Sequence, residues 1–135
     1  MDIKGRDFLS TADFTLAELT ELIDLASEFK SGEHDERPLL GQSVALVFFN
    51  PSLRTRASME IAVYQLGGNP VTLDIGQGTW SLEYHEGVVM DTDKTEHIKE
   101  AARVLSRYAA AIAVRAFPQM RDLKEDMAEI GRAHV

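Results

Sequence analysis

The chain has 135 residues, of which 44% are hydrophobic and 27% are charged, a composition typical of one soluble globular domain. Its formal net charge of −8 argues against general binding to nucleic acids or to anionic membranes, because both need a basic surface. The chain has no cysteine, which excludes disulfides and thiolate metal sites. No apolar run approaches the roughly 20 residues that cross a bilayer, so we expect a cytoplasmic protein.

The first predicted element is an amphipathic helix. Thr15 is followed three positions later by Glu18, and this is the spacing of a capping box at the start of a helix. Apolar residues recur at helical spacing beyond it, and Gly32 is a suitable stop. We therefore expect a helix that begins at Thr15 and ends just before Gly32.

A strand, a helix and a second strand are predicted next. Residues 43–49 form a continuous apolar run, which suits a parallel strand covered on both faces. Asn50 and Pro51 interrupt it, and a helical pattern follows from Ser52 to the glycine pair at residues 67–68. Residues 70–75 then have the composition of a short strand.

The last predicted elements follow a long segment without clear periodicity. We interpret residues 76–94 as a long loop, a feature that is usually functional. A helix over residues 95–108 and a strand over residues 111–115 complete the pattern. Alternating strands and helices predict an α/β fold, a three-layer domain in which helices flank a parallel sheet.

One short segment carries the residues expected to bind an anion. Residues 52–56 follow the first strand, where ligands of open parallel sheets bind and where the amino end of a helix presents unpaired amides. Ser52 can cap the helix, and Arg54 can donate two parallel hydrogen bonds to a phosphate. The alternative is that Ser52 only caps and that both arginines, Arg54 and Arg56, pair with Glu60 or other carboxylates. Spacing alone does not choose between the two.

A longer match favours the anion site. Residues 48–56, with the sequence Phe-Phe-Asn-Pro-Ser-Leu-Arg-Thr-Arg, resemble the signature of the aspartate and ornithine transcarbamoylase family. In that family a Ser-x-Arg-Thr-Arg turn binds carbamoyl phosphate. Four further segments resemble the branch that acts on N-acylated ornithine, and they are residues 65–68, 78–80, 89–91 and 114–117.

The resemblance implies a carbamoyl-phosphate-binding domain and assigns roles to individual residues. Ser52, Leu53, Arg54 and Thr55 would hold the phosphate, and Arg115, at the end of its strand, would add a further contact. Arg54, Thr55 and Arg115 would be the catalytic groups. Arg56 is left open, since it either touches the ligand or braces neighbouring carboxylates.

The long loop is expected to serve a second subunit. By resemblance, Trp80 reaches carbamoyl phosphate in a neighbouring protomer, which implies a homotrimer. Thr95 falls where the acyl group would be sensed, although it does not decide between acetyl and succinyl. The acidic residues Glu83, Asp91 and Asp93 could face the amino-acid substrate or could simply be solvated.

The implied reaction transfers the carbamoyl group of carbamoyl phosphate to the side-chain amine of N-acetylornithine, giving N-acetylcitrulline and phosphate in arginine biosynthesis. No cofactor and no metal are expected. The alternatives are an enzyme acting on N-succinylornithine or ornithine, or a non-catalytic module that binds a phosphate ligand.

We expect the domain to occupy residues 1–128 and to be incomplete at its carboxyl end, with the amino-acid-binding domain absent. Residues 129–135 resemble no segment of the family and match a translated sequencing adapter, so we expect adapter read-through there. An amino-terminal fragment of this kind would be inactive by itself.

Overall fold

The computed structural model describes residues 3, 5–33, 35–85, 87–90 and 94–117. The chain divides into two compact units, residues 1–36 and 37–135, and each is described by itself. Asp91, Asp93 and residues 129–135 lie outside the described residues, so the expectations for them stay predictions.

The first unit contains a short 3₁₀ helix, η1 (Thr11–Asp13), and the helix α1 (Leu16–Ser31). The predicted capping box is confirmed: the Thr15 hydroxyl accepts the Glu18 amide, and the Glu18 carboxylate accepts the Thr15 amide. Gly32 ends the helix at φ 81°, in the left-handed region that glycine adopts without steric cost. Local chemistry therefore sets both ends of α1, as predicted.

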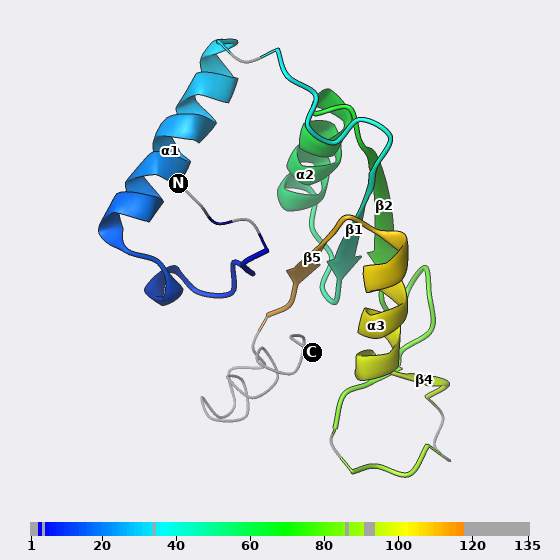
Figure 1. Ribbon diagram of the computed structural model, residues 1–135. Coiled ribbons are helices and arrows are strands. Elements are labelled where there is room, and N and C mark those ends of the chain that lie inside the picture. Colours follow the sequence, from blue (N-terminus) through cyan, green and yellow to red (C-terminus); the bar gives the residue numbers. More distant parts are fainter. Residues whose placement is uncertain (1–2, 4, 34, 86, 91–93, 118–135) are drawn as a thin grey trace. The chain divides into compact units, whose positions relative to one another are not determined.

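A three-stranded parallel sheet organises the second unit (Figure 1). Its strands are β1 (Ser43–Phe48), β2 (Asn69–Asp74) and β5 (Ala111–Arg115), in the order β2-β1-β5. Every residue of the central strand from Val44 to Phe48 is buried. The apolar run predicted to be covered on both faces is therefore the middle of the sheet.

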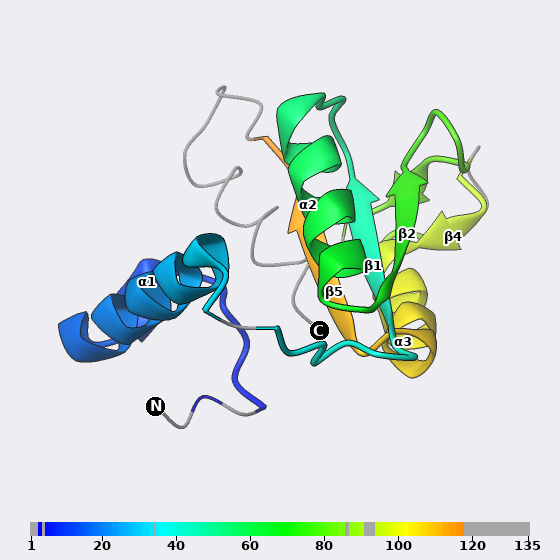
Figure 2. The same ribbon diagram turned by 90° about the horizontal axis from the view of Figure 1, so that it is seen from above.

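Two helices cover the sheet, α2 (Arg54–Gln65) and α3 (Ile98–Tyr108). The connection through α2 leads from β1 to β2, whereas the connection through α3 leads from β2 back past β1 to β5. Such crossover connections are right-handed, and these two run across the sheet in opposite directions. The helices α2 and α3 therefore lie on opposite faces of the sheet, as Figure 2 shows. The predicted three-layer α/β fold is confirmed. Its core contains Val44, Leu46, Phe48 and, from α2, Val63.

The segment between β2 and α3 differs from the prediction of a structureless loop. It contains two short parallel strands, β3 (Leu82–Glu83) and β4 (Glu96–His97), which pair with each other. Because β4 takes Glu96 and His97, α3 begins at Ile98, three positions later than predicted. The His97 side chain accepts the Lys99 amide and so caps α3.

No helix in the described part of the chain is long and apolar enough to cross a membrane. Among the same residues, no group of three or more His, Cys, Asp or Glu side chains could hold a metal ion.

Candidate functional site

The strand order locates the candidate site. In open parallel sheets, ligands bind beyond the carboxyl ends of the strands, at the point where successive connections turn in opposite directions. Here that point lies between β1 and β5, since β1 connects outward to β2 and the chain then returns to β5. The segment after β1, with residues 49–56, and the end of β5 at Arg115 meet at this edge.

The amino end of α2 presents unpaired amides at this edge. The residue before the helix is Leu53, and within the described part of the chain no side chain caps it. The prediction that Ser52 caps the helix is therefore wrong, because α2 begins one residue too late for its hydroxyl to serve. The first amide bonded along the helix is that of Ala57, to the Leu53 carbonyl. The amides of Arg54, Thr55 and Arg56 are thus left for a ligand, next to the positive end of the helix dipole.

The structure separates the two arginines that the sequence presents as equivalent. The Arg56 guanidinium pairs with the Glu60 carboxylate, at 3.1 Å, and with the Asp74 carboxylate, at 2.5 Å. Arg56 therefore braces the first turns of α2 against the end of β2. This pairing with Asp74 raises the pKa of Arg56, while a hydrogen bond from Thr72 and the pairing with Arg56 lower the pKa of Glu60.

Arg54 has the opposite environment. Its side chain is exposed and forms no hydrogen bond or ion pair with any described residue. It can therefore pair with an incoming anion without first losing a carboxylate partner. Of the alternatives left open by the sequence, pairing with Glu60 holds for Arg56 and not for Arg54.

Arg115 reaches across from the end of β5 to the segment after β1. Its Nη1 donates to the Asn50 carbonyl, at 2.8 Å, and to the Pro51 carbonyl, at 3.0 Å. Its guanidinium carbon lies 4.2 Å from the centre of the Phe117 ring. Because Nη1 has only two hydrogens, the edge formed by Nε and Nη2 is what remains for a ligand. Arg115 therefore lies at the same edge of the sheet as the amino end of α2.

Trp80 lies in the segment before β3, with its side chain exposed. Its indole Nε1 donates to the Glu96 carboxylate of β4 at 3.0 Å, so the ring is held within its own chain. Thr95, the residue expected to sense the acyl group, is exposed next to Glu96.

Glu83 organises the rest of this segment. Its side chain is buried, and one carboxylate oxygen accepts the Tyr84 amide, the His85 amide and His85 Nδ1, all within 2.9 Å. Lys94 Nζ lies 3.3 Å from the other oxygen. The hydrogen bonds from His85, with those from Tyr84 and Lys94, lower the pKa of Glu83 to about 2. Glu83 is therefore a buried carboxylate with a structural role. The sequence had suggested instead that it faces the amino-acid substrate or is simply solvated.

His97 has an equally defined role in this segment. Its Nδ1 accepts the Lys99 amide, so its Nε2, 3.1 Å from the His85 carbonyl, is the nitrogen that donates. The ring thus links β4, α3 and the Glu83 cluster.

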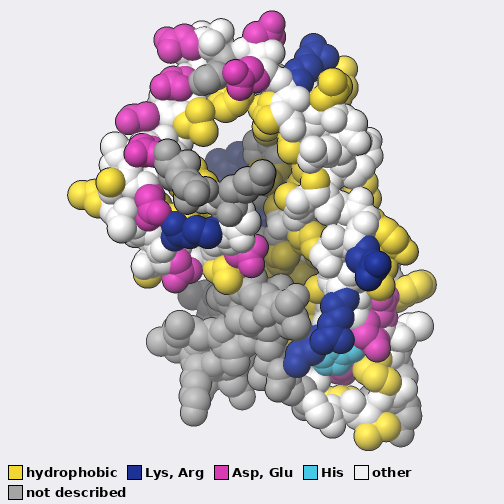
Figure 3. Space-filling model, in the orientation of Figure 1, with side chains coloured by type: hydrophobic (Ala, Val, Ile, Leu, Met, Phe, Trp, Pro, Cys, Tyr) yellow, Lys and Arg dark blue, Asp and Glu magenta, His cyan; other side chains and the backbone are white. Residues whose placement is uncertain are grey.

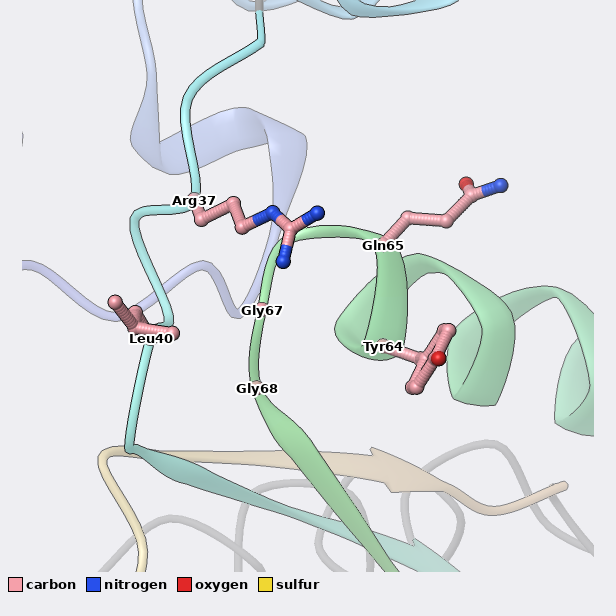
Figure 4. A pocket seen from close by; sticks show the side chains of 6 residues that line it. All are labelled: Arg37, Leu40, Tyr64, Gln65, Gly67 and Gly68. Carbon is pink, nitrogen blue, oxygen red and sulfur yellow. The ribbon is translucent and has the colours of Figure 1, made fainter.

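A pocket of about 340 Å³ lies elsewhere (Figure 4). It is lined by Arg37, Leu40, Tyr64, Gln65, Gly67 and Gly68, at the end of α2 and just before β2. This is the amino edge of the sheet, opposite the edge where parallel sheets bind ligands. The Gly67 and Gly68 amides already donate to carbonyls of α2, so they are not available to an anion.

A second group of basic residues lies along α3, where Lys99, Arg103 and Arg107 recur every four positions. Figure 3 shows Lys and Arg side chains gathered over this helix. Arg107, in the last turn, lies far from the carboxyl edge of the sheet because α3 runs antiparallel to the strands. It provides a matched control for the arginines of the candidate site.

Sequence reasoning missed three residues of this region: Asn50, Glu83 in its structural role, and Glu96. Asn50 was interpreted only as a strand breaker, although an Asn before a Pro at the end of a strand is a signal for a fixed turn. No local pattern could have paired Glu96 with Trp80, 16 positions away.

Comparison with known proteins gives concordant results. A sequence model described as the carbamoyl-P binding domain of aspartate/ornithine carbamoyltransferase matches residues 6–135. The N-acetylornithine carbamoyltransferase of Xanthomonas campestris pv. campestris is 49% identical over 121 residues, which are 90% of this chain and 35% of that protein. The N-succinylornithine carbamoyltransferase of Bacteroides fragilis is 44% identical over 89 residues, 66% of this chain and 28% of that protein.

Solved structures agree with the sequence matches. A mutant of N-acetyl-L-ornithine transcarbamylase, complexed with carbamyl phosphate and N-succinyl-L-norvaline, superposes with a TM-score of 0.84 at 44% identity. The match covers 95% of this chain and 40% of that one. The chain thus spans about a third of the length of the curated relatives it matches.

Proposed function

Because this chain belongs to the aspartate/ornithine carbamoyltransferase family, matching its carbamoyl-P binding domain, we propose that it binds carbamoyl phosphate where β1, α2 and β5 meet. In the whole protein this site would serve transfer of the carbamoyl group to N-acetylornithine, in the cytoplasm. The observation that carries the proposal is Arg54, an arginine without a partner among the described residues, beside the unpaired amides of α2. A solved relative complexed with carbamyl phosphate supports the choice of ligand.

Each predicted residue has a place in the proposed site. The phosphate takes the amides at the start of α2, the Ser52 hydroxyl and the Arg54 guanidinium, since an anion prefers the positive end of a helix and a forked donor. Thr55 and Arg115 face the carbamoyl oxygen. Leu53 contributes its backbone, while its side chain is 84% exposed. Arg56 stays outside the ligand contacts because two carboxylates hold it.

The proposed chemistry needs no covalent enzyme intermediate. The side-chain amine of the acceptor attacks the carbamoyl carbon, the carbonyl oxygen becomes an oxyanion, and the C–O bond to phosphate then breaks as the nitrogen loses a proton. The chain contributes positioning and donors aimed at the oxyanion and at the leaving phosphate. Removal of one such donor typically costs about 100- to 1,000-fold in rate.

Calorimetric titration with carbamoyl phosphate tests the site directly. Arg54→Ala should reduce the affinity at least tenfold, because charge-assisted hydrogen bonds contribute about 1.5–3 kcal/mol each. Arg107→Ala removes the same side chain from the far end of α3 and should leave the affinity unchanged. Equal affinities for the two variants would refute the assignment, as would a parent chain that does not bind.

The acceptor is proposed as N-acetylornithine because the relative from Xanthomonas is named for it and matches over 90% of the chain. N-Succinylornithine is the second candidate, supported by the Bacteroides relative and by the solved complex with N-succinyl-L-norvaline. Rates of the whole enzyme with N-acetyl-, N-succinyl- and free ornithine would decide. If the whole protein binds carbamoyl phosphate but transfers the carbamoyl group to none of these acceptors, the chain would instead be a non-catalytic module that binds a phosphate ligand.

We also propose that the whole protein is a homotrimer in which Trp80 completes the site of a neighbour. The exposure of Trp80 supports this role, because a 58% exposed tryptophan in a structured segment is available to a partner surface. Sedimentation of the whole protein and of its Trp80→Ala variant measures the oligomeric state. The transfer activity of the same two proteins tests whether Trp80 completes the site.

A further inference from the structure

Asn50 joins the ends of the two central strands. Its side-chain Oδ1 accepts the backbone amide of Phe117 at 2.7 Å, beyond the end of β5. Its backbone carbonyl accepts Nη1 of Arg115 at 2.8 Å. Phe49, the preceding residue, donates its amide to the Arg115 carbonyl at 2.9 Å. Two segments about 65 positions apart in the sequence are thus connected at the floor of the proposed site.

These contacts fix the Arg115 side chain from two directions. The carbonyls of Asn50 and Pro51 hold its Nη1, and the ring of Phe117 lies against its guanidinium. The Phe117 ring is in turn placed by the hydrogen bond from its own amide to Asn50. Asn50 therefore acts on Arg115 both through its own carbonyl and through Phe117.

The residue types suit this role. Pro51 fixes its own φ and restricts Asn50 to extended backbone, so the Asn50 carbonyl has little freedom to turn away. Pro51 has no amide hydrogen and therefore acts only as an acceptor toward Arg115. A neutral amide side chain supplies an acceptor for Phe117 without placing a negative charge beside a bound phosphate, as an aspartate would.

We propose that Asn50 is a positioning residue, which sets the Arg115 guanidinium at the ligand by binding it through the Asn50 carbonyl and by anchoring Phe117 through the side chain. This inference rests on the proposed function, since the guanidinium is useful in this orientation only if an anion binds there. It adds to that function a residue that does not touch the ligand itself but determines where Arg115 contacts the ligand.

The test compares three variants of the chain: Asn50→Ala, Asn50→Asp and, as a matched control, Asn69→Ala. Asn69 is an exposed asparagine that begins β2 at the opposite edge of the sheet. Two quantities are measured in each variant, the calorimetric affinity for carbamoyl phosphate and the hydrogen exchange rate of the Phe117 amide. Thermal unfolding reports whether each variant is folded.

Asn50→Ala should weaken carbamoyl phosphate binding by about three- to tenfold, the effect of one hydrogen bond, and should speed exchange at Phe117. Asn50→Asp keeps the acceptor oxygen and should restore slow exchange. Asn69→Ala should change neither quantity. In an Arg115→Ala background, Asn50→Ala should cost less affinity than it does alone, because Asn50 acts through Arg115.

If Asn50→Ala speeds exchange at Phe117 but binds carbamoyl phosphate as tightly as the control Asn69→Ala, Asn50 only holds the turn. The positioning role would then be refuted, while the proposed function would stand. An equal loss of affinity on Asn50→Ala in the parent chain and in the Arg115→Ala chain would also refute the proposal that Asn50 acts through Arg115. A parent chain that does not bind carbamoyl phosphate would instead refute the proposed function, and the positioning role with it.

Discussion

At the scale of single residues, Glu83 shows how a carboxylate becomes a structural element. Burial alone disfavours its charge, and three donors from Tyr84 and His85, together with Lys94, compensate for the lost water. The net result is a pKa lowered from 4.5 to about 2, so the carboxylate is charged in the folded chain over nearly the whole working pH range.

This shift predicts an acid dependence of stability. Because the folded-state pKa of Glu83 is lower than its unfolded value of 4.5, its contribution is fully present above that pH. It is lost as the pH falls toward the folded value of about 2. Glu83→Gln should therefore lower the free energy of unfolding at neutral pH and flatten its decline through this acid window.

Urea unfolding of the parent chain and the variant, at several pH values, measures the difference. Glu18 and Glu60 also have lowered pKa values but are common to both chains, so the comparison isolates Glu83. Glu100→Gln, an exposed change on α3, is the control and should keep the parent's acid profile. A Glu83→Gln profile parallel to the parent's would contradict the structural role.

The two arginines mark the limit of what spacing could predict at this scale. Spacing alone gave Arg54 and Arg56 equal claim to an anion or to Glu60, since both lie in one turn of helix, and the family resemblance left only Arg56 open. What separates them is Asp74, which ends β2 and reaches Arg56 from 18 positions away. Ser52 shows the same limit, because its predicted capping role depended on a helix boundary that falls one residue later.

At the scale of elements, length decides which predictions succeed. The strands of five or six residues and the helices of eleven or more were predicted with their types and with bounds close to those observed. The strands β3 and β4 have two residues each, too few for any periodicity, and they were missed. Glu83 and His97 lie opposite each other in this pair, and the partners of their side chains are not evident from the sequence.

The pair formed by Trp80 and Glu96 gives this element a direct spectroscopic test. Trp80 is the only tryptophan in the sequence, so intrinsic fluorescence reports on it alone. Glu96→Ala removes the acceptor of its indole N–H and should increase acrylamide quenching and lower the emission anisotropy. Glu96→Gln retains an acceptor oxygen and should behave like the parent, while Glu100→Ala is the control for loss of a carboxylate. Identical quenching in the two alanine variants would show that Glu96 does not order the ring.

At the scale of the whole molecule, β1 provides both the core and the frame of the site. Its residues from Val44 to Phe48 are buried between α2 and α3, and its end leads directly to Asn50. The fold class followed from the alternation of elements. The meeting of Arg115 with the α2 end followed only from the resemblance to a family, because a strand-end arginine has no local feature that indicates its partner.

Leu46 is the most deeply buried large side chain among the described residues, at 1% exposure. Leu46→Ala should destabilise the chain by about 2–5 kcal/mol, through lost burial and the cavity left behind. Val104→Ala, on the exposed side of α3, should change the free energy of unfolding by less than about 1 kcal/mol. Denaturant titrations of both variants measure this contrast, and a small effect of Leu46→Ala would contradict a well-packed centre of the sheet.

The strand order also dictates when the site can form during folding. Strands β1 and β2 are separated by a single helix, so their pairing closes a short loop, whereas β5 must return from much further along the chain. Long closures cost more chain entropy and are slower to form. We therefore expect the unit β1-α2-β2 to assemble first and β5 to dock afterwards. The amide end of α2 would then exist before Arg115 arrives, so binding of a ligand that contacts both would stabilise the last step of folding rather than the first.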